Sequence, residues 1–474
     1  MTKGVTAPKE KDFSTWYQDV ILKAGLIEYS LVSGCMVIRP YAYRMWELLR
    51  DALDSGFKER GVENAYFPLL IPESLLKKEQ EHVEGFNPEV AWVTETGDTK
   101  LPERLAIRPT SETIMYDSYR KWIRSHRDLP LLINQWNNVV RWEFKHPVPF
   151  LRTREFLWQE GHTCFATKKE ADKDVHAALD LYEKVFVELM AIPVLKGIKS
   201  DKEKFAGADY TTSLETIFPN GKAIQGCTSH ALGQNFSKAF DISFQDENEK
   251  KAYVWQNSWG FTTRTIGILL GVHGDDKGLV LPPKIAPIQA VIVPIYKSDD
   301  RDKVLKEANL IFKSIKDIRA KLDDRDEYSP GFKFNEWELK GVPVRVEIGP
   351  KDIEKKQCVL VRRDTGAKEA IALKDAPKKI GLMLEDIQDN LYKKASKFLK
   401  DHIVDVKSLA ELKKAVETGN FGKADWCGSP KCEEVVKDKT GAKSLNSSFD
   451  SKPKGKCVFC GEKAQFVTHF GRSY

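Results

Sequence analysis

The sequence has few cysteines and no long apolar run. Eight cysteines in 474 residues are too few for a disulfide scaffold, and four of them stand alone, which is typical of a reducing compartment. No stretch of about 18 apolar residues occurs, and residues 1–30 lack the charged-then-apolar order of a secretion signal. These absences disfavour a secreted or membrane-spanning protein, and we expect a cytoplasmic one.

Two glycine-rich nucleotide-binding motifs are also missing. The chain contains neither GxxxxGK[ST] nor GxGxxG, the patterns of P-loop and dinucleotide-binding folds. If the protein binds a nucleotide, side chains must hold its phosphates. Planar guanidinium groups are well suited to that task because each can donate two parallel hydrogen bonds.

The net charge of +6 is mild but unevenly distributed. Residues 286–400 carry 25 basic and 20 acidic side chains, and residues 401–474 carry 13 and 10. An excess of cations favours a polyanionic partner such as nucleic acid, but a solvated, lysine-rich surface gives the same counts. Charge alone leaves both interpretations open.

Length and proline content predict three domains. A chain of 474 residues exceeds the size at which a single core stops growing. The proline-dense stretch 281–287 cannot continue a helix or a central strand, so it marks a boundary. Beyond it, 288–295 and 342–348 are typical of strands and 304–315 of a helix. We predict a mixed domain over 1–285, an α/β domain over 286–400 and a small C-terminal domain over 401–474.

Two local patterns stand out in the first domain. Apolar residues recur at helical spacing over 41–60, and Gly61 is a suitable stop. Residues 64–72 then predict one strand, in which Pro68 removes a hydrogen-bond donor. We therefore place that strand at a sheet edge or an interface.

Residues 132–144 and 150–162 predict two strands joined by a loop. The pair carries many charged side chains: Arg141, Glu143, Arg152, Arg154, Glu155, Glu160 and His162. Burying an ion is unfavourable unless a partner or ligand compensates its charge, so an inward-facing cluster indicates a ligand site. The alternative is an exposed ribbon of surface ion pairs.

These stretches resemble the motifs of a known family. Arg-Trp-Glu, a loop and Phe-Leu-Arg-Thr resemble motif 2 of the class II aminoacyl-tRNA synthetases, 41–72 resembles motif 1, and 258–267 with 273–283 resembles motif 3. Five further stretches resemble the prolyl enzymes of the archaeal and eukaryotic type, a class IIa group without an inserted editing domain. They lie at 108–112, 158–162, 203–207, 228–230 and 349–352.

The resemblance implies an α/β protein of the α+β type. It should have a mixed, mainly antiparallel sheet with flanking helices, then an α/β anticodon-binding domain and a small zinc-binding domain. The implied activity is ATP-dependent activation of L-proline and its transfer to tRNA(Pro) by a homodimer. The rivals are a related enzyme for threonine or histidine and an RNA-binding protein that has lost catalysis; the catalytic arginines argue against the latter.

By the same resemblance, three arginines carry the chemistry. Arg141 holds the α-phosphate of ATP, while Arg152 and Arg264 hold the outer phosphates. Proline's carboxylate attacks the α-phosphorus directly, so charge stabilisation and positioning provide the catalysis. Mg²⁺ is expected to neutralise the leaving pyrophosphate, with no protein ligand assigned. The other implied ATP contacts are Glu143 to the adenine amine, Phe156 stacked on the base, and Gln225, Thr228 and Thr262.

The implied proline site consists of Thr110, Glu112, Arg141, Trp158, Glu160, His162, Phe205 and His230. Carboxylates suit a secondary ammonium ion, and flat aromatic walls suit a pyrrolidine ring, although each aromatic residue alone is more simply explained as core. Cys227 stands where glycine is expected; it either narrows the pocket or packs as a small apolar side chain. Because such a pocket cannot strongly reject smaller amino acids, we expect misactivation of alanine, and of cysteine.

The resemblance also implies residues that read the anticodon. Proline anticodons end in two guanines, whose edges offer acceptors to an arginine or lysine and donors to a carboxylate. The implied reading residues are Glu338, Arg345 and Lys368. Each of them alone is more simply explained as a surface charge.

Four cysteines near the C-terminus have metal-ligand spacing. Cys427 and Cys432 are separated by four residues, and Cys457 and Cys460 by two, with 24 residues between the pairs. Four thiolates complete a zinc tetrahedron and leave no open position for catalysis, so the pattern predicts a structural zinc site. The alternative is four unrelated reduced thiols.

Overall fold

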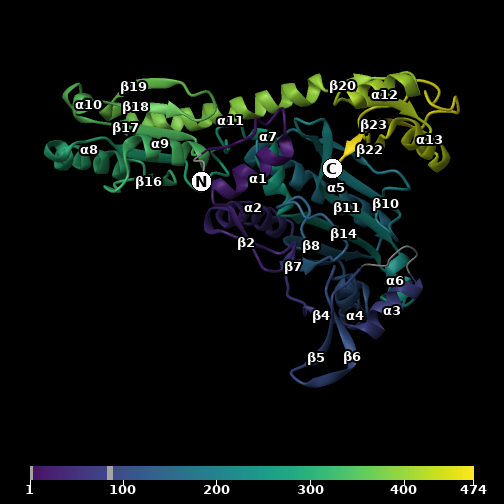
Figure 1. Ribbon diagram of the computed structural model, residues 1–474. Helices are drawn as coiled ribbons and strands as arrows, with labels where there is room; N and C mark the ends of the chain where they lie inside the picture. Colours follow the sequence, from purple (N-terminus) through teal and green to yellow (C-terminus); the bar gives the residue numbers. More distant parts are fainter. Residues whose placement is uncertain (1–3, 83–88) are drawn as a thin grey trace.

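The computed structural model describes residues 4–82 and 89–474. Its centre is an eleven-stranded, mainly antiparallel sheet (Figure 1), which confirms the expected fold class. Across the sheet the strands run β20 (Ile403–Asp405), β21 (Phe421–Trp426), β23 (Phe466–Ser473), β22 (Lys443–Ser448), β9 (Leu195–Ile198), β10 (Tyr210–Ile217), β11 (Lys222–Gly233), β14 (Trp255–Thr262), β8 (Glu155–Phe165), β7 (Leu131–Val140) and β3 (Glu63–Asn64).

Helices pack on this sheet and bury the largest core. They are α1 (Phe13–Lys23), α2 (Pro40–Glu59), α5 (Lys168–Lys184) with a π-helical extension over Val185–Leu189, and α7 (Arg264–His273). The helix predicted over 41–60 is confirmed as α2. Proline at position 40 starts it, Met45 and Leu49 are buried on its inner face, and the chain turns at Gly61 with φ of +77°. Beside it, β1 (Ile27–Tyr29) and β2 (Met36–Ile38) form a hairpin.

The single strand predicted over 64–72 is wrong. Strand β3 ends at Asn64 on the edge of the main sheet, and β4 (Leu70–Pro72) belongs to a separate three-stranded sheet. Pro68 lies between them, and its missing N–H and fixed φ explain the interruption. The other elements of this region are β5 (Trp92–Thr96), β6 (Thr99–Ile107), α3 (Glu73–His82), α4 (Glu112–Trp122), α6 (Asn235–Phe240), β12 (Ser243–Gln245) and β13 (Lys251–Tyr253).

Residues 286–400 form an α/β unit with its own sheet and core. The predicted strand–helix–strand pattern is present as β15 (Ala290–Pro294), α8 (Arg301–Ser314) and β17 (Val344–Ile348). Strand β15 pairs in parallel with both of its neighbours. The remaining elements are β16 (Ala320–Leu322), α9 (Pro330–Leu339), α10 (Pro350–Glu354), β18 (Gln357–Arg362), β19 (Lys368–Ala372) and α11 (Ala376–Asp401).

The long helix α11 leads from this unit to the C-terminal segment (Figure 1). The strands of that segment extend the main sheet, because β22 pairs with β9 and β23 pairs with β11. Helices α12 (Leu409–Glu417) and α13 (Pro430–Thr440) lie against them around Trp426 and Phe470. Within the described ranges, no helix is both long and apolar enough to cross a membrane.

Candidate active site

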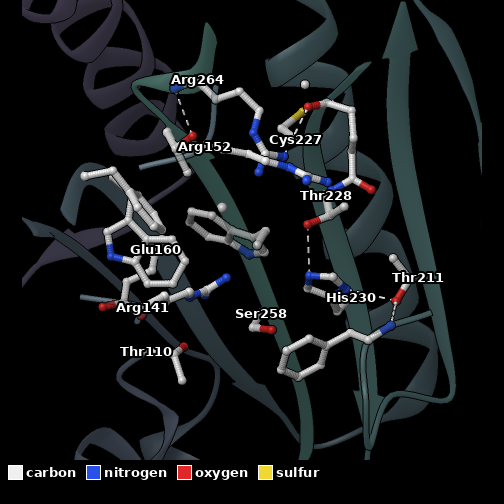
Figure 2. A pocket seen from close by; sticks show the side chains of 18 of the residues that line it. Thr110, Arg141, Arg152, Glu160, Thr211, Cys227, Thr228, His230, Ser258 and Arg264 are labelled. Atoms are coloured by element: carbon white, nitrogen blue, oxygen red, sulfur yellow. Dashed lines mark hydrogen bonds between the residues drawn. The ribbon is translucent and has the colours of Figure 1, made fainter. Parts of the chain in front are cut away.

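One cavity of about 280 Å³ collects most of the predicted site residues (Figure 2). Strand β8 explains how: alternate residues of a strand face the same side, so Trp158, Glu160 and His162 all line the cavity. From the predicted ATP set the cavity contains Arg141, Arg152, Phe156, Gln225, Thr228, Thr262 and Arg264. From the predicted proline set it contains all eight residues: Thr110, Glu112, Arg141, Trp158, Glu160, His162, Phe205 and His230.

Three arginines converge on this cavity without an Asp or Glu side chain as partner in the described part of the chain; Arg152 donates from Nη2 to the main-chain oxygen of the terminal residue Tyr474 at 3.0 Å. Arg264, the first residue of α7, donates from Nε to the backbone oxygen of Leu151 at 3.3 Å, and Arg141 donates to that of Pro109 at 3.0 Å. Among the described residues, no Asp or Glu forms an ion pair with Arg141, Arg152 or Arg264. Burial, then the charges of Arg141 and Arg152, lower the pKa of Arg264 to about 10, so it stays charged at neutral pH. A cluster of arginines without Asp or Glu ion pairs suits a polyanion.

Aromatic rings lie beside the arginine at the centre of the cavity. The guanidinium carbon of Arg141 lies 5.6 Å from the ring centre of Phe156 and 5.4 Å from that of Trp158. The two rings meet edge to face at 6.0 Å. The indole N–H of Trp158 is buried and has no hydrogen-bond partner within the described part of the chain. The cavity therefore offers flat apolar walls and at least one free donor.

At the other end, Glu160 and His162 form a buried, hydrogen-bonded pair. The His162 Nε2 atom lies 3.1 Å from a Glu160 carboxylate oxygen, and both side chains are almost fully buried. Burial is the largest influence and opposes both charges, but the mutual hydrogen bond, the neighbouring charges and the donors to Glu160 together outweigh it, so the pKa of Glu160 lies below and that of His162 above the usual value. Ser111, Gln135 and Asn137 also donate to Glu160. The carboxylate is satisfied by hydrogen bonds and needs no metal ion.

The inward-facing cluster predicted for the two strands is only partly correct. Glu160 and His162 are buried, and Arg141 and Arg152 line the cavity. Glu143 and Glu155, in contrast, are exposed, and Glu143 is not among the lining residues. Glu143 follows the end of β7, where the alternation that directs side chains inward no longer applies. Its contact with adenine remains a prediction.

Several lining residues were not predicted from the sequence. They include Phe144, Glu203, Thr211, Ser258 and Gly260. Ser258 and Gly260 share a strand face with Thr262, so period-two alternation along β14 could have found them. Thr211 carries no sequence signal; it enters because β10 pairs with β11 and places Thr211 opposite His230. Cys227 also lines the cavity and is 4% exposed.

The three predicted anticodon-reading residues also lie together. Glu338, Arg345 and Lys368 line a second cavity of about 160 Å³ in the 286–400 unit. Arg345 and Lys368 both reach Glu347, at 2.8 and 3.3 Å, and Glu338 accepts from Lys277 at 2.9 Å. The cavity thus presents both donors and an acceptor.

The four C-terminal cysteines form one cluster. All four sulfur atoms lie within 4.8 Å of one another, with 3.8 Å between Cys432 and Cys457 and 3.6 Å between Cys427 and Cys460. In a tetrahedral site with zinc–sulfur bonds of about 2.3 Å, the sulfur atoms lie roughly 3.8 Å apart. The geometry therefore fits a closed zinc site.

Comparison with family models divides the chain into three parts. Residues 93–273 match the tRNA synthetase class II core domain (G, H, P, S and T), residues 289–381 match the anticodon binding domain, and residues 409–474 match the prolyl-tRNA synthetase C-terminal domain. Each match falls within one of the three ranges predicted above.

Whole-chain comparisons agree with these matches. A proline–tRNA ligase of Natranaerobius thermophilus is 53% identical over 96% of this chain and 94% of its own. The bifunctional glutamate/proline–tRNA ligase of Cricetulus griseus is 50% identical over 99% of this chain, which spans a third of that longer relative. A crystal structure of the prolyl-tRNA synthetase from Cryptosporidium parvum, complexed with halofuginone and AMPPNP, superposes with a TM-score of 0.96 at 46% identity and covers both chains completely.

Proposed function

Since this chain belongs to the prolyl-tRNA synthetase family, the proline–tRNA ligases, we propose that its main cavity forms prolyl-adenylate from proline and ATP and passes the prolyl group to tRNA(Pro). One observation carries the assignment to this cavity. Three arginines without Asp or Glu ion pairs in the described part of the chain lie beside a buried carboxylate–imidazole pair in a single space of about 280 Å³. The first feature suits a triphosphate and the second suits an amino acid.

The arginine end would bind ATP. Proline's carboxylate oxygen forms a bond to the α-phosphorus while the bond to pyrophosphate breaks, and negative charge accumulates on the phosphate oxygens. Arg141 would contact the α-phosphate, and Arg152 and Arg264 the outer phosphates. Fixed positive charges in a cavity of this kind lower the barrier because they need no reorganisation. Mg²⁺ would enter with ATP on its phosphate oxygens, and we assign it no protein ligand.

The opposite end would bind proline. Glu112 or Glu160 would accept from the secondary ammonium group, and the pyrrolidine ring would lie between Trp158 and Phe205. The remaining lining residues of this end, Thr110, His162 and His230, would complete the hydrogen bonds. This division places the amino acid next to Arg141, where the carboxylate must meet the α-phosphate.

Two further parts of the molecule would bind the tRNA anticodon and a structural metal ion. The cavity with Glu338, Arg345 and Lys368 would read guanines of the anticodon. The four-cysteine cluster would bind a structural Zn²⁺, which its sulfur spacing supports. We assign the domains to 1–285, 286–400 and 401–474, and place the protein in the cytoplasm.

We also propose that the enzyme is a C2 dimer. Strand β3 lies at the edge of the main sheet. The segment before α2 separately exposes apolar side chains, with Leu31 fully accessible and Val32 and Val37 half exposed. A symmetric partner would cover both the edge and the patch. A mass in light scattering that stays monomeric at all concentrations would refute this.

One assay tests the main proposal: exchange of labelled pyrophosphate into ATP with a panel of amino acids. Exchange should depend most strongly on proline. Exchange driven by threonine or histidine would favour a related enzyme, and no exchange with any amino acid would indicate a protein that has lost catalysis.

A further inference from the structure

His230 is held between two threonine hydroxyl groups. The Thr211 Oγ1 atom lies 2.9 Å from Nδ1 of the ring, and the Thr228 Oγ1 atom lies 2.9 Å from Nε2 (Figure 2). Thr211 is on β10 and the other two residues are on the neighbouring β11. Burial, then the charges of His162 and Arg141, lower the pKa of His230 to about 3, so the ring is neutral at physiological pH. A neutral imidazole has one N–H group and one acceptor nitrogen.

The hydroxyl of Thr211 decides which nitrogen carries the proton. It already accepts the backbone N–H of Phe205 at 2.9 Å, and the residue is 1% exposed. If the Thr211 hydroxyl donates to Nδ1, three hydrogen bonds are made: from Phe205 N–H to Thr211, from Thr211 to Nδ1 of His230, and from Nε2–H of His230 to Thr228. If Nδ1 carried the proton instead, the hydroxyl would accept twice, and its own buried proton would have no acceptor within the described part of the chain. The second arrangement is unfavourable because a buried donor is left unpaired.

The tautomer of His230 determines which hydrogen bond Thr228 can make in the cavity. With the proton on Nε2, the ring donates to Thr228, and the hydroxyl proton of Thr228 is free to point into the cavity that this residue lines. Thr211 also ties the loop that carries Phe205, whose ring lies 4.8 Å from that of His230. One hydroxyl therefore fixes a ring tautomer and a wall of the cavity.

Resting on the proposed function, we infer that Thr211 is a positioning residue for proline activation. It holds His230 in the Nε2–H form, so that Thr228 donates to an anionic oxygen of the substrate, either the carboxylate of proline or a phosphate oxygen of the adenylate. Because the Thr228 hydroxyl accepts from His230, its own proton stays available for a substrate oxygen that accepts a hydrogen bond.

The test compares T211V, which removes the oxygen at nearly equal volume, with T211S, which keeps it. T211V should lower kcat/KM for proline about 10-fold, because it removes both hydrogen bonds of the Thr211 hydroxyl and no longer fixes the tautomer of His230, whereas T211S should stay within about threefold. The matched control is T212V: Thr212 is on the same strand, equally buried, and bonds only the backbone oxygen of Ser229. Its kcat/KM should also stay within about threefold of the wild-type value. Equal losses in T211V and T212V, or none in T211V, would overturn the inference.

A second measurement needs no stable variant. Nitrogen NMR of the full-length protein with labelled histidine distinguishes protonated from unprotonated ring nitrogens, and H230N identifies the relevant signals among nine histidines. The wild type should show Nε2–H for His230, and Nδ1–H would overturn the inference. Failure of the proposed function would look different: no proline-dependent exchange in the wild type, whatever the tautomer.

Discussion

Arg363 and Asp275 form a two-pronged ion pair between the 286–400 unit and the catalytic core. The Nη1–Oδ2 distance is 2.7 Å and the Nη2–Oδ1 distance is 2.5 Å, and Nε of Arg363 also donates to the backbone oxygen of Glu338 at 2.8 Å. Asp275 follows the last residue of α7 by two positions, and Arg264 is the first residue of the same helix. Helix α7 thus begins at Arg264, a proposed phosphate ligand. Just beyond its end, Asp275 is linked through Arg363 to Glu338, a proposed anticodon-reading residue.

This arrangement predicts that Arg363→Ala impairs tRNA charging more than proline activation. Losing charged hydrogen bonds costs roughly 1.5–3 kcal/mol when they are well shielded, and Asp275 is partly exposed, so we expect about a 10-fold loss in aminoacylation. Pyrophosphate exchange needs no tRNA and should change little. The control is Arg301→Ala, whose ion pairs with Asp302 and Asp326 stay within the unit and which does not line the proposed reading cavity. Equal losses in both assays would contradict the coupling.

Arg264→Ala should reduce proline-dependent pyrophosphate exchange by about 100-fold or more, because losing one charge that opposes the transition-state phosphate costs roughly 3 kcal/mol. Arg264→Lys should be intermediate, since an ammonium group keeps the charge but not the planar fork. Arg154→Ala is the matched control: Arg154 belongs to the same region but stacks on Trp142 outside the cavity lining. Near-normal exchange in a folded Arg264→Ala protein would refute the role.

The patterns that predicted correctly are local. The apolar period of α2 lies within one segment, and the four cysteines lie in two short ones. Local chain geometry was therefore enough to predict the helix and the clustering of the cysteines. The interruption at Pro68 and the outward position of Glu143 depend on where strands begin and end, which is the least reliable part of a sequence-based prediction. The place of Thr211 depends on the register between β10 and β11, which the sequence does not show.

Cys457→Ser should release zinc and loosen the C-terminal segment. Three remaining thiolates hold the metal poorly, and zinc binding contributes directly to folding at such sites. We expect one zinc per wild-type chain by elemental analysis, and faster hydrogen exchange over 427–474 in the variant. Cys35→Ser, which changes a cysteine outside the cluster, should keep its zinc. A wild-type protein purified without zinc would overturn the assignment.

The Glu160–His162 pair predicts how stability changes with pH. The folded pKa of His162 is raised, so its contribution is complete below the unfolded value of about 6.5 and is lost as pH rises through the folded value. The folded pKa of Glu160 is lowered, so its contribution is complete above about 4.3 and is lost as pH falls through the folded value. The pair therefore stabilises most between these limits.

Thermal unfolding midpoints between pH 6 and 9 measure this effect. The wild type should lose stability on the alkaline side, and His162→Asn should flatten that decline because no imidazolium remains to titrate. His146→Asn changes an exposed histidine in the loop between β7 and β8 and should leave the slope unchanged. A wild-type slope identical to that of His162→Asn would contradict a charged pair.

The enzyme should activate alanine as well as proline and should not hydrolyse the mischarged product. Alanine lacks ring methylenes of proline, and the loss of such contacts is worth only about 1–3 kcal/mol, which corresponds to 10- to 200-fold discrimination. Correction would require a second, hydrolytic site. The segment between His162 and Arg264 is fully described, and it is occupied by α5, α6 and strands β9 to β14, most of them in the main sheet or its core. No separate domain remains within it.

Alanine-dependent pyrophosphate exchange should therefore be detectable, and purified enzyme should leave alanyl-tRNA(Pro) intact over times in which it charges proline repeatedly. Rapid deacylation by this chain alone would reveal a hydrolytic site elsewhere in the molecule.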